Sequence, residues 1–244
     1  MLPFHPAAPL RSAIVEGVRG IFNDRAGGET PVQPSPHALF PTDSVMRNVH
    51  ADVTAMMIGG VAALLMQMLH PAALAGVWDH SRFRDDMTGR LRRTARFIAL
   101  TSYAERAEAL AAVARVKRIH AGVRGTLPDG TPYRADDPHL LAWVHVCEAH
   151  CFLAAHLRFV NPRLSAADRD AYMVQSGTVA ALLGADPVPQ TQAECERMLA
   201  GYRPELRVDA RTRSVAAAIL SPPVKPEMRV AQRLLAQAAI DLLP

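Results

Sequence analysis

The chain is poor in aromatic residues, which make up 5% of its 244 residues, and it contains only three cysteines. With so few aromatic rings, alanine, leucine and valine must fill most of any hydrophobic core. An odd number of cysteines in a long chain argues against a disulfide framework and for reduced, mostly buried thiols at Cys147, Cys151 and Cys195. A cytoplasmic location is the default expectation.

Long hydrophobic runs and a strong charge imbalance are also missing. The longest apolar stretch, residues 56–69, is too short to cross a bilayer and contains Gln67. The first residues have no basic cluster before a long apolar segment, so we expect no secretion signal. The formal charge of +4 comes from 27 basic and 23 acidic residues without a basic tract, which argues against nucleic-acid binding. We expect a soluble protein without a membrane span.

Sequence signatures of several common enzyme classes do not occur. There is no GxSxG of a serine hydrolase, and no GxGxxG or Walker loop for a nucleotide. A di-iron carboxylate bundle needs Glu-x-x-His pairs, but Glu148 is followed by Cys151 at the third position. Cys147, His150 and Cys151 have a helical spacing that could hold zinc. No second ligand pair follows, so buried cysteines are the better interpretation.

What the sequence does contain is helical periodicity. Residues 1–43 are expected to form an N-terminal arm with one short amphipathic helix around residues 12–22, which could wrap the domain or a second subunit of a homodimer. Residues 44–244 are expected to form a single all-α bundle domain. Its helices are predicted at about residues 45–69, 88–103, 104–122, 138–160, 165–183, 191–201, 212–220 and 228–243, with a small hairpin or loop around residues 129–130.

Local signals mark the end and the close contacts of the first long helix. Pro71 disfavours helical geometry at His70, so the helix over residues 45–69 should end there. The segment after Val77 is polar and should be rich in turns. Gly59 and Gly60 would let another helix or a flat cofactor approach this helix closely.

One histidine stands out on the helix over residues 104–122. His120 continues an apolar face at steps of three or four residues, and that face comprises Leu110, Val113, Val116, His120 and Val123. A histidine on such a face is more often a core residue than a ligand. Arg124 brings a cation to the same interior edge, where something anionic should meet it. Haem supplies both partners, because its iron takes an imidazole nitrogen and its propionates take arginines.

A second group of polar residues lies on the preceding helix. Arg90, Thr94 and Phe97 share one face, with Arg93 beside them. A solvated basic face is the commoner fate of a run such as RLRR, but Thr94 and Phe97 indicate that Arg90 faces something buried. His70 is held at a helix end beside the core.

Three segments together resemble a known oxygenase family. In their order along the chain they are GGVAALLMQMLHPAALAGVWDHSRFRDD, RLRRT and RIHAGVRGTLPDGTPYRADDPHLLAWVH. They are similar to the family that contains MpaB of the mycophenolic-acid pathway and the bacterial latex-clearing rubber oxygenases. The resemblance covers roughly residues 45–160. It implies an all-helical, globin-like fold and haem b bound through His120.

The resemblance also implies roles for other residues. Arg90 and Thr94 match positions that line the haem pocket, and Arg124 matches the arginine after the ligand. His70 and His145 match recurring positions for which core hydrogen bonding is the expected role.

The chain departs from the rubber-cleaving enzymes at two positions. They carry a lysine that can close the distal iron site where this chain has Arg93, and a guanidinium is a poor iron ligand, so an open or water-bound distal position is implied. Their catalytic glutamate has no convincing counterpart. The implied function is a haem b-dependent oxygenase that uses dioxygen to cleave a double bond of a small apolar substrate, with Arg93 and His70 as hydrogen-bond donors to oxygen. The alternatives are a haem carrier or sensor without turnover and a haem-free helical interaction module.

Overall fold

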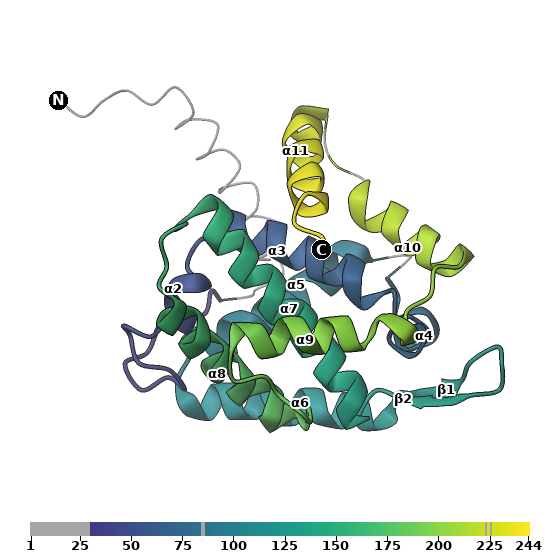
Figure 1. The fold of residues 1–244 in the computed structure, drawn as a ribbon, viewed down its shortest axis with the longest axis horizontal. Coiled ribbons are helices and arrows are strands. Elements are labelled where there is room, and N and C mark those ends of the chain that lie inside the picture. Colours follow the sequence, from purple (N-terminus) through teal and green to yellow (C-terminus); the bar gives the residue numbers. More distant parts are fainter. Residues whose placement is uncertain (1–29, 84–85, 223, 225) are drawn as a thin grey trace.

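The structure is a computed structural model that describes residues 30–83, 86–222, 224 and 226–244 (Figure 1). These residues form ten α-helices, two 3-10 turns and one pair of short strands. The all-helical prediction is therefore confirmed for this part of the chain, whereas a globin-like haem architecture stays a prediction. The short helix predicted around residues 12–22 lies outside the described residues.

The elements follow one another with short connections. In chain order they are α2 (Val45–Val49), α3 (Val53–Gln67), α4 (Pro71–His80), α5 (Met87–Tyr103), α6 (Arg106–Gly122), β1 (Arg124–Thr126), β2 (Pro132–Arg134), α7 (Pro138–Phe159), α8 (Ala166–Leu183), α9 (Gln192–Gly201), η1 (Arg203–Glu205), α10 (Ala210–Leu220), η2 (Pro226–Met228) and α11 (Arg229–Ile240).

Helices α3 and α7 form the centre of the bundle. A Cβ atom on Gly59 of α3 would lie 2.8 Å from the carbonyl oxygen of Cys151 on α7, so the absence of a side chain allows the two backbones to meet. The indole N–H of Trp143 donates a hydrogen bond of 3.2 Å to the carbonyl oxygen of Gln67. The close approach predicted at Gly59 is confirmed.

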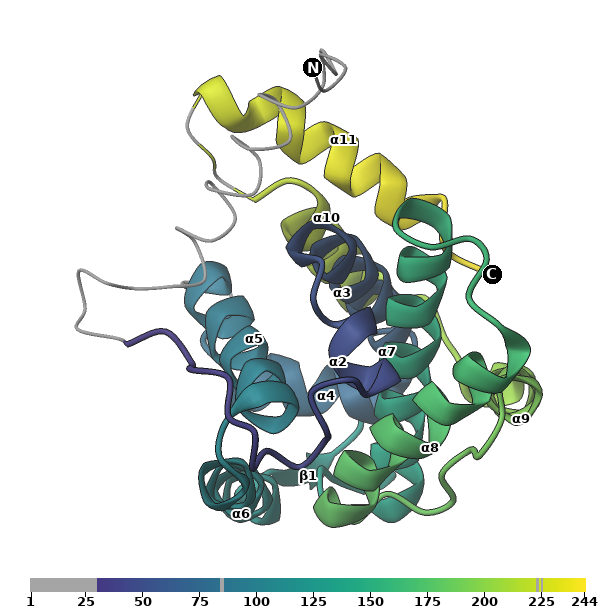
Figure 2. The same cartoon turned by 90° about the vertical axis from the view of Figure 1, so that its left-hand side faces the viewer.

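The other helices surround this pair. Helices α8 and α9 pack on α7, and α10 and α11 pack on α3. Figure 2 shows α3 between α5 and α7, with α6 crossing near the end of α5. The core contains many small side chains, such as the fully buried Ala62, Ala142 and Ala155. The three cysteines are buried free thiols, as predicted.

The prediction of one continuous helix over residues 45–69 is wrong. The segment divides at residues 50–52 into α2 and α3, because Asp52 takes an extended conformation and its carboxylate accepts a hydrogen bond of 2.8 Å from the N–H of Ala55. Aspartate competes for backbone donors in this way and therefore favours helix N-caps over helix interiors. The predicted end before Pro71 is confirmed, since α3 ends at Gln67.

The segment after Pro71 is predicted to become turn-rich beyond Val77, and this prediction is wrong for residues 78–80 and correct for residues 81–83. It forms α4, which continues to His80 and is bent by 104° from α3. Pro71 occupies the first turn, where its missing N–H costs nothing, and Nδ1 of His70 accepts a hydrogen bond of 3.2 Å from the N–H of Ala72. A histidine cap and a first-turn proline therefore start a new helix.

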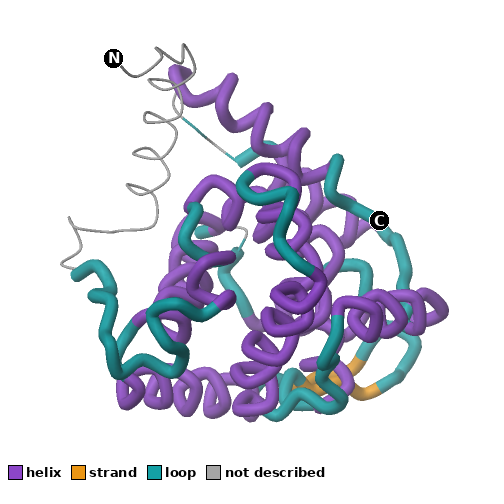
Figure 3. Tube along the Cα trace, turned by 60° about the vertical axis from the view of Figure 1, so that its left-hand side comes forward, coloured by secondary structure: helices purple, strands orange, loops and turns teal. Residues whose placement is uncertain are grey.

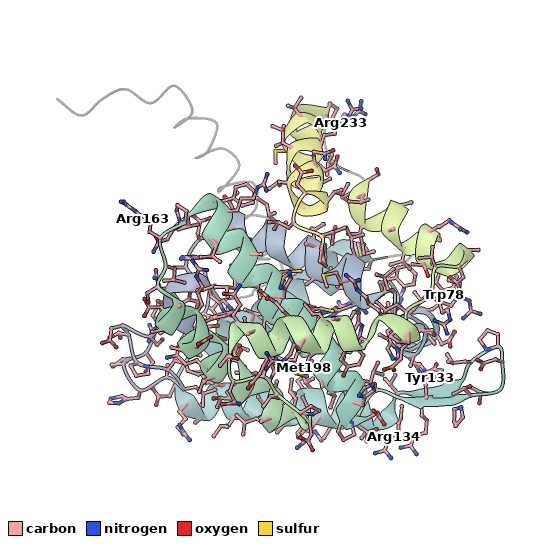
Figure 4. The ribbon with its side chains drawn as sticks, in the orientation of Figure 1. Trp78, Tyr133, Arg134, Arg163, Met198 and Arg233 are labelled. Carbon is pink, nitrogen blue, oxygen red and sulfur yellow. The ribbon has the colours of Figure 1, made fainter. Side chains whose placement is uncertain are left out.

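The predicted small hairpin is confirmed as β1 paired antiparallel with β2, at one end of the molecule (Figure 3). Gly130 in its turn has φ of 90°. Figure 4 labels Tyr133 and Arg134 on β2. The hydroxyl of Tyr133 donates a hydrogen bond of 2.8 Å to Asp79 on α4. This bond fixes the hairpin, and with it the chain after α6, against α4.

Helix α7 is long and apolar enough to cross a membrane by length and composition, and α3 with α4 passes the same test as a bent pair. In the fold, however, 72% of the most apolar window of α7 is buried. A central core helix can have the same composition as a membrane span, so the burial of α7 in this fold accounts for its apolar composition.

Candidate functional site

A cavity of about 540 Å³ lies between α3, α5 and α7, with residues 31–34 along one side. Most of its lining is aliphatic, including Met57, Val61 and Ile98. Apolar pockets of this size with a few polar groups are typical of small-molecule sites. Gly60 leaves part of this space open because it has no side chain. A Cβ atom there would meet only the ring of Phe152, at 3.6 Å.

Glu148 is a carboxyl group in the lining of this cavity. It lies on α7 between the buried Cys147 and Cys151. Burial raises its pKa to about 7, and the hydrogen bond from Gln67 opposes this rise. The donated bond, from Nε2 of Gln67 to Oε1 of Glu148, measures 3.4 Å. A carboxyl group with such a pKa can hold or release a proton near neutral pH.

Gln67 also lines the cavity and is held firmly. Its Nε2 donates a second hydrogen bond, of 3.2 Å, to the carbonyl oxygen of Val144 on α7. The backbone carbonyl oxygen of Gln67 accepts the hydrogen bond from the indole of Trp143. The amide therefore bridges the two central helices and orients the carboxyl group of Glu148.

His50 lines the cavity as well, but both of its ring nitrogens are already occupied. Nδ1 lies 2.9 Å from the hydroxyl of Ser102 and Nε2 lies 3.1 Å from the hydroxyl of Tyr172. Burial, and secondarily the nearby His156, lower its pKa to about 3. His50 is thus a neutral residue of the cavity wall that connects α2, α5 and α8.

Thr94 is the residue of the predicted site that lines the cavity. Its hydroxyl donates a hydrogen bond of 3.3 Å to the carbonyl oxygen of Arg90, one turn earlier on α5. Arg90 itself lines a separate space of only about 10 Å³, among Phe83, Met87 and Val215. Burial lowers the pKa of Arg90, as does the neighbouring Arg93. One helical turn therefore separates two different environments.

Arg93 and His70 lie outside the cavity. The side chain of Arg93 is 63% exposed, and its Nη1 lies 3.4 Å from the carboxylate of Asp86 at the start of α5. Because Nδ1 of His70 accepts the capping bond, Nε2 carries the proton and donates to Glu205 at 3.3 Å. Glu205 also binds His139 at 3.0 Å. His70 therefore connects α4 with η1 through a carboxylate at the surface rather than through a bond in the core.

His120 lies in the last turn of α6 and is partly buried, but it does not line the cavity. Burial lowers its pKa, which favours the neutral imidazole that a metal needs. The predicted apolar face is buried at Val113, whereas Leu110 is 37% exposed. Arg124 is exposed on β1 and donates a hydrogen bond of 2.5 Å to the carbonyl oxygen of Ala121.

The residues that the resemblance assigns to haem do not converge in one pocket. Thr94 lines the cavity, Arg90 lines a neighbouring space, and His120 and Arg124 line neither of the two. The imidazole in the cavity wall, that of His50, has no free nitrogen. In the arrangement described, these residues do not fit a haem in the cavity with His120 as its axial ligand. Among the residues that the structure describes there is also no cluster of three metal-binding side chains.

His145 differs from its expected role. It is 7% exposed, and its Nε2 has no hydrogen-bond partner among the described residues. Burial lowers its pKa to about 4. It lies one turn before Glu148 on the same face of α7, but no hydrogen bond explains its position there.

Sequence reasoning missed Glu148, Gln67 and His50 as cavity residues. Glu148 did carry a signal, because it is the acidic residue in the middle of the most apolar helix, with no arginine or lysine three or four residues away. A lone carboxyl group in such a helix needs a polar partner from another element. The position of the cavity on that side of α7 follows only from packing.

The chain was compared with known families, proteins and structures. Residues 47–244 match the family described as the catalytic domain of the ER-bound oxygenase mpaB/B′ and of rubber oxygenase. No curated protein and no solved structure gives a significant match. The match covers all the elements described above except the first residues of α2, including both central helices and every wall of the cavity except residues 31–34. The chain therefore belongs to the mpaB/rubber oxygenase catalytic-domain family.

Proposed function

We propose that the protein is an oxygenase whose small, largely apolar substrate binds in the cavity between α3, α5 and α7. The family supports oxygen chemistry. The observation that carries the substrate class is the cavity itself, which is about 540 Å³ in volume and lined mainly by aliphatic side chains. Burial of an apolar molecule there gains about 25 cal/mol for each Å² removed from water.

The residues of the cavity have separate tasks in this proposal. The aliphatic walls from α3 and α5 bind the substrate. Gln67 orients Glu148, which holds or releases a proton near neutral pH. Thr94 adds a hydroxyl to the opposite wall on α5. Dioxygen is itself apolar and enters such a space readily.

The cofactor stays a prediction. Haem b bound through His120 is implied by the resemblance, but His120 is not in the cavity wall. Oxidative cleavage of a double bond likewise stays the expectation from the resemblance.

Oxygen consumption by the purified full-length protein tests the proposal. We would measure uptake with 6-dodecene and with its saturated analogue dodecane, each with and without ascorbate as reductant. Gly60→Leu fills the cavity from α3, and Gly201→Leu is the matched control, because a Cβ atom at Gly201 meets nothing within 4 Å. We expect the wild type to consume oxygen with 6-dodecene but not with dodecane. This consumption should be lost in Gly60→Leu and kept in Gly201→Leu. Equal uptake in both variants would contradict the proposal.

A further inference from the structure

We propose that Glu148 and Gln67 form a polar recognition pair, in which Gln67 orients Glu148 and the carboxyl group of Glu148 binds one neutral oxygen atom of an otherwise apolar substrate. The site would then bind a long-chain ketone, aldehyde or alcohol more tightly than a pure hydrocarbon of the same length. This inference rests on the proposed function, since it takes the cavity as the substrate site. It adds the position and the chemistry of the single polar contact.

The two residues come from different helices and meet at the cavity wall. Gln67 ends α3, and Glu148 lies in the middle of α7. The amide of Gln67 is fixed by its bond to Val144, and its backbone is fixed by Trp143. The pair therefore has little freedom to turn away, so a ligand oxygen meets groups that are already oriented.

The carboxyl group of Glu148 has unused hydrogen-bonding capacity. Within the described part of the chain, the bond from Gln67 is the one hydrogen bond that it makes, and no arginine or lysine pairs with it there. Glu148 is partly buried, and a carboxyl group has room for several hydrogen bonds, so its remaining capacity is open to a molecule in the cavity. A ligand oxygen at this place would supply the missing partner.

The charges around the cavity favour a neutral ligand at this end. The other titratable side chains in the lining are His50, Arg96 and Tyr103. His50 is neutral and saturated, and Arg96 lies on α5 and donates a hydrogen bond of 3.0 Å to the carbonyl oxygen of Thr30. An anionic head group beside Glu148 would meet a second carboxyl group without a cation between them.

The protonation state of Glu148 decides which oxygen it binds. Its pKa is about 7, so the carboxyl group is mostly protonated at pH 6 and mostly ionised at pH 8. A protonated carboxyl group donates a hydrogen bond and therefore binds a ketone. An ionised carboxylate only accepts, and therefore binds an alcohol but not a ketone. The preference should change between these two pH values.

The experiment is displacement of the neutral fluorophore 1-aminoanthracene from the purified full-length protein by dodecan-2-one, dodecan-2-ol and dodecane. At pH 6 we expect the wild type to bind the ketone about tenfold more tightly than dodecane, which corresponds to one hydrogen bond. At pH 8 the ketone should lose this advantage and the alcohol should keep it.

Two substitutions at Glu148 separate recognition from folding. Glu148→Leu should bind the three ligands with equal affinity at both pH values. Glu148→Gln keeps a donor and an acceptor but cannot titrate, so it should prefer the ketone equally at pH 6 and pH 8. Glu108→Leu, at an exposed position on α6, is the control and should behave as the wild type.

The outcomes also distinguish the inference from the proposed function. Equal binding of the three ligands by the wild type, with displacement still lost in Gly60→Leu, would overturn the recognition pair and leave the cavity as the substrate site. Binding that is unchanged in Gly60→Leu, or no binding at all, would overturn both. A ketone preference that survives in Glu148→Leu would assign recognition to another residue and overturn the inference.

Discussion

Nε2 of Gln67 on α3 lies 3.4 Å from Oε1 of Glu148 on α7, and this contact joins the two central helices at the wall of the cavity. Glu148 is an ionisable group in the middle of the most apolar helix, and its partner in this contact, the amide of Gln67, carries no charge. A neutral partner lets the carboxyl group stay protonated near pH 7, whereas a cation would keep it ionised.

Glu148 should make the stability of the protein depend on pH. Its pKa in the folded state is about 7, above the ordinary value of 4.5, so the folded state holds the proton more tightly. The free energy of unfolding should therefore fall as the pH rises from 4.5 to above 7. A pKa difference of one between the folded and unfolded states corresponds to about 1.4 kcal/mol, so the loss should be at most about 3.5 kcal/mol, and smaller to the extent that water in the cavity screens the charge.

Denaturation by urea at several pH values measures this effect as the difference between the wild type and Glu148→Gln. Burial also lowers the pKa of His50 and His145, but these histidines are present in both proteins and cancel in the difference. The difference should be small at pH 5 and should favour Glu148→Gln at pH 8. A constant difference over this range would show that the carboxyl group titrates normally.

Gly59 and Gly60 should respond differently to replacement by alanine. A Cβ on Gly59 would lie 2.8 Å from a backbone oxygen of α7, so Gly59→Ala should force the central helices apart and cost about 1 to 3 kcal/mol. A Cβ on Gly60 would lie at an ordinary contact distance of 3.6 Å from Phe152, so Gly60→Ala should stabilise the helix by up to about 1 kcal/mol. Thermal unfolding of the pair measures both effects, and equal changes would contradict the packing of α3 on α7.

The hydrogen bonds of His50 should contribute to stability. Tyr172→Phe removes the hydroxyl that contacts Nε2 and leaves a buried nitrogen without a partner, which should cost about 1 to 3 kcal/mol. Ser102→Ala should have a similar effect at Nδ1. Chemical denaturation checks both variants. Changes below about 0.3 kcal/mol in each would mean that water replaces the lost partners.

Haem binding through His120, as implied by the family resemblance, has a spectroscopic test. It predicts a Soret band in the purified protein, with or without added haem, that shifts on reduction with dithionite and is lost or altered in His120→Ala. Arg93→Ala should keep the band, because the side chain of Arg93 is 63% exposed and pairs with Asp86. A colourless protein that does not take up haem would limit the family resemblance to the fold. A band unchanged in His120→Ala would assign the iron to another residue.

The sequence by itself determined the features that depend on neighbouring residues. Pro71 ended a helix, helical periodicity predicted most of the remaining helices, and the Asp129-Gly130 pair predicted the hairpin turn. The family could also be identified from the order of short motifs. These features follow from backbone sterics and from the spacing of apolar side chains, both of which act over a few residues.

The tertiary structure alone decided where the cavity lies and which residues face it. Thr94 and Arg90 share one face of α5, but residues of α4 and α10, such as Val77 and Val215, line the space at Arg90, and Thr94 lines the main cavity. Glu148 and Gln67 are 81 residues apart and meet because Gly59 lets α3 and α7 approach closely. Periodicity identifies the face of a helix, whereas contact between helices decides what that face meets.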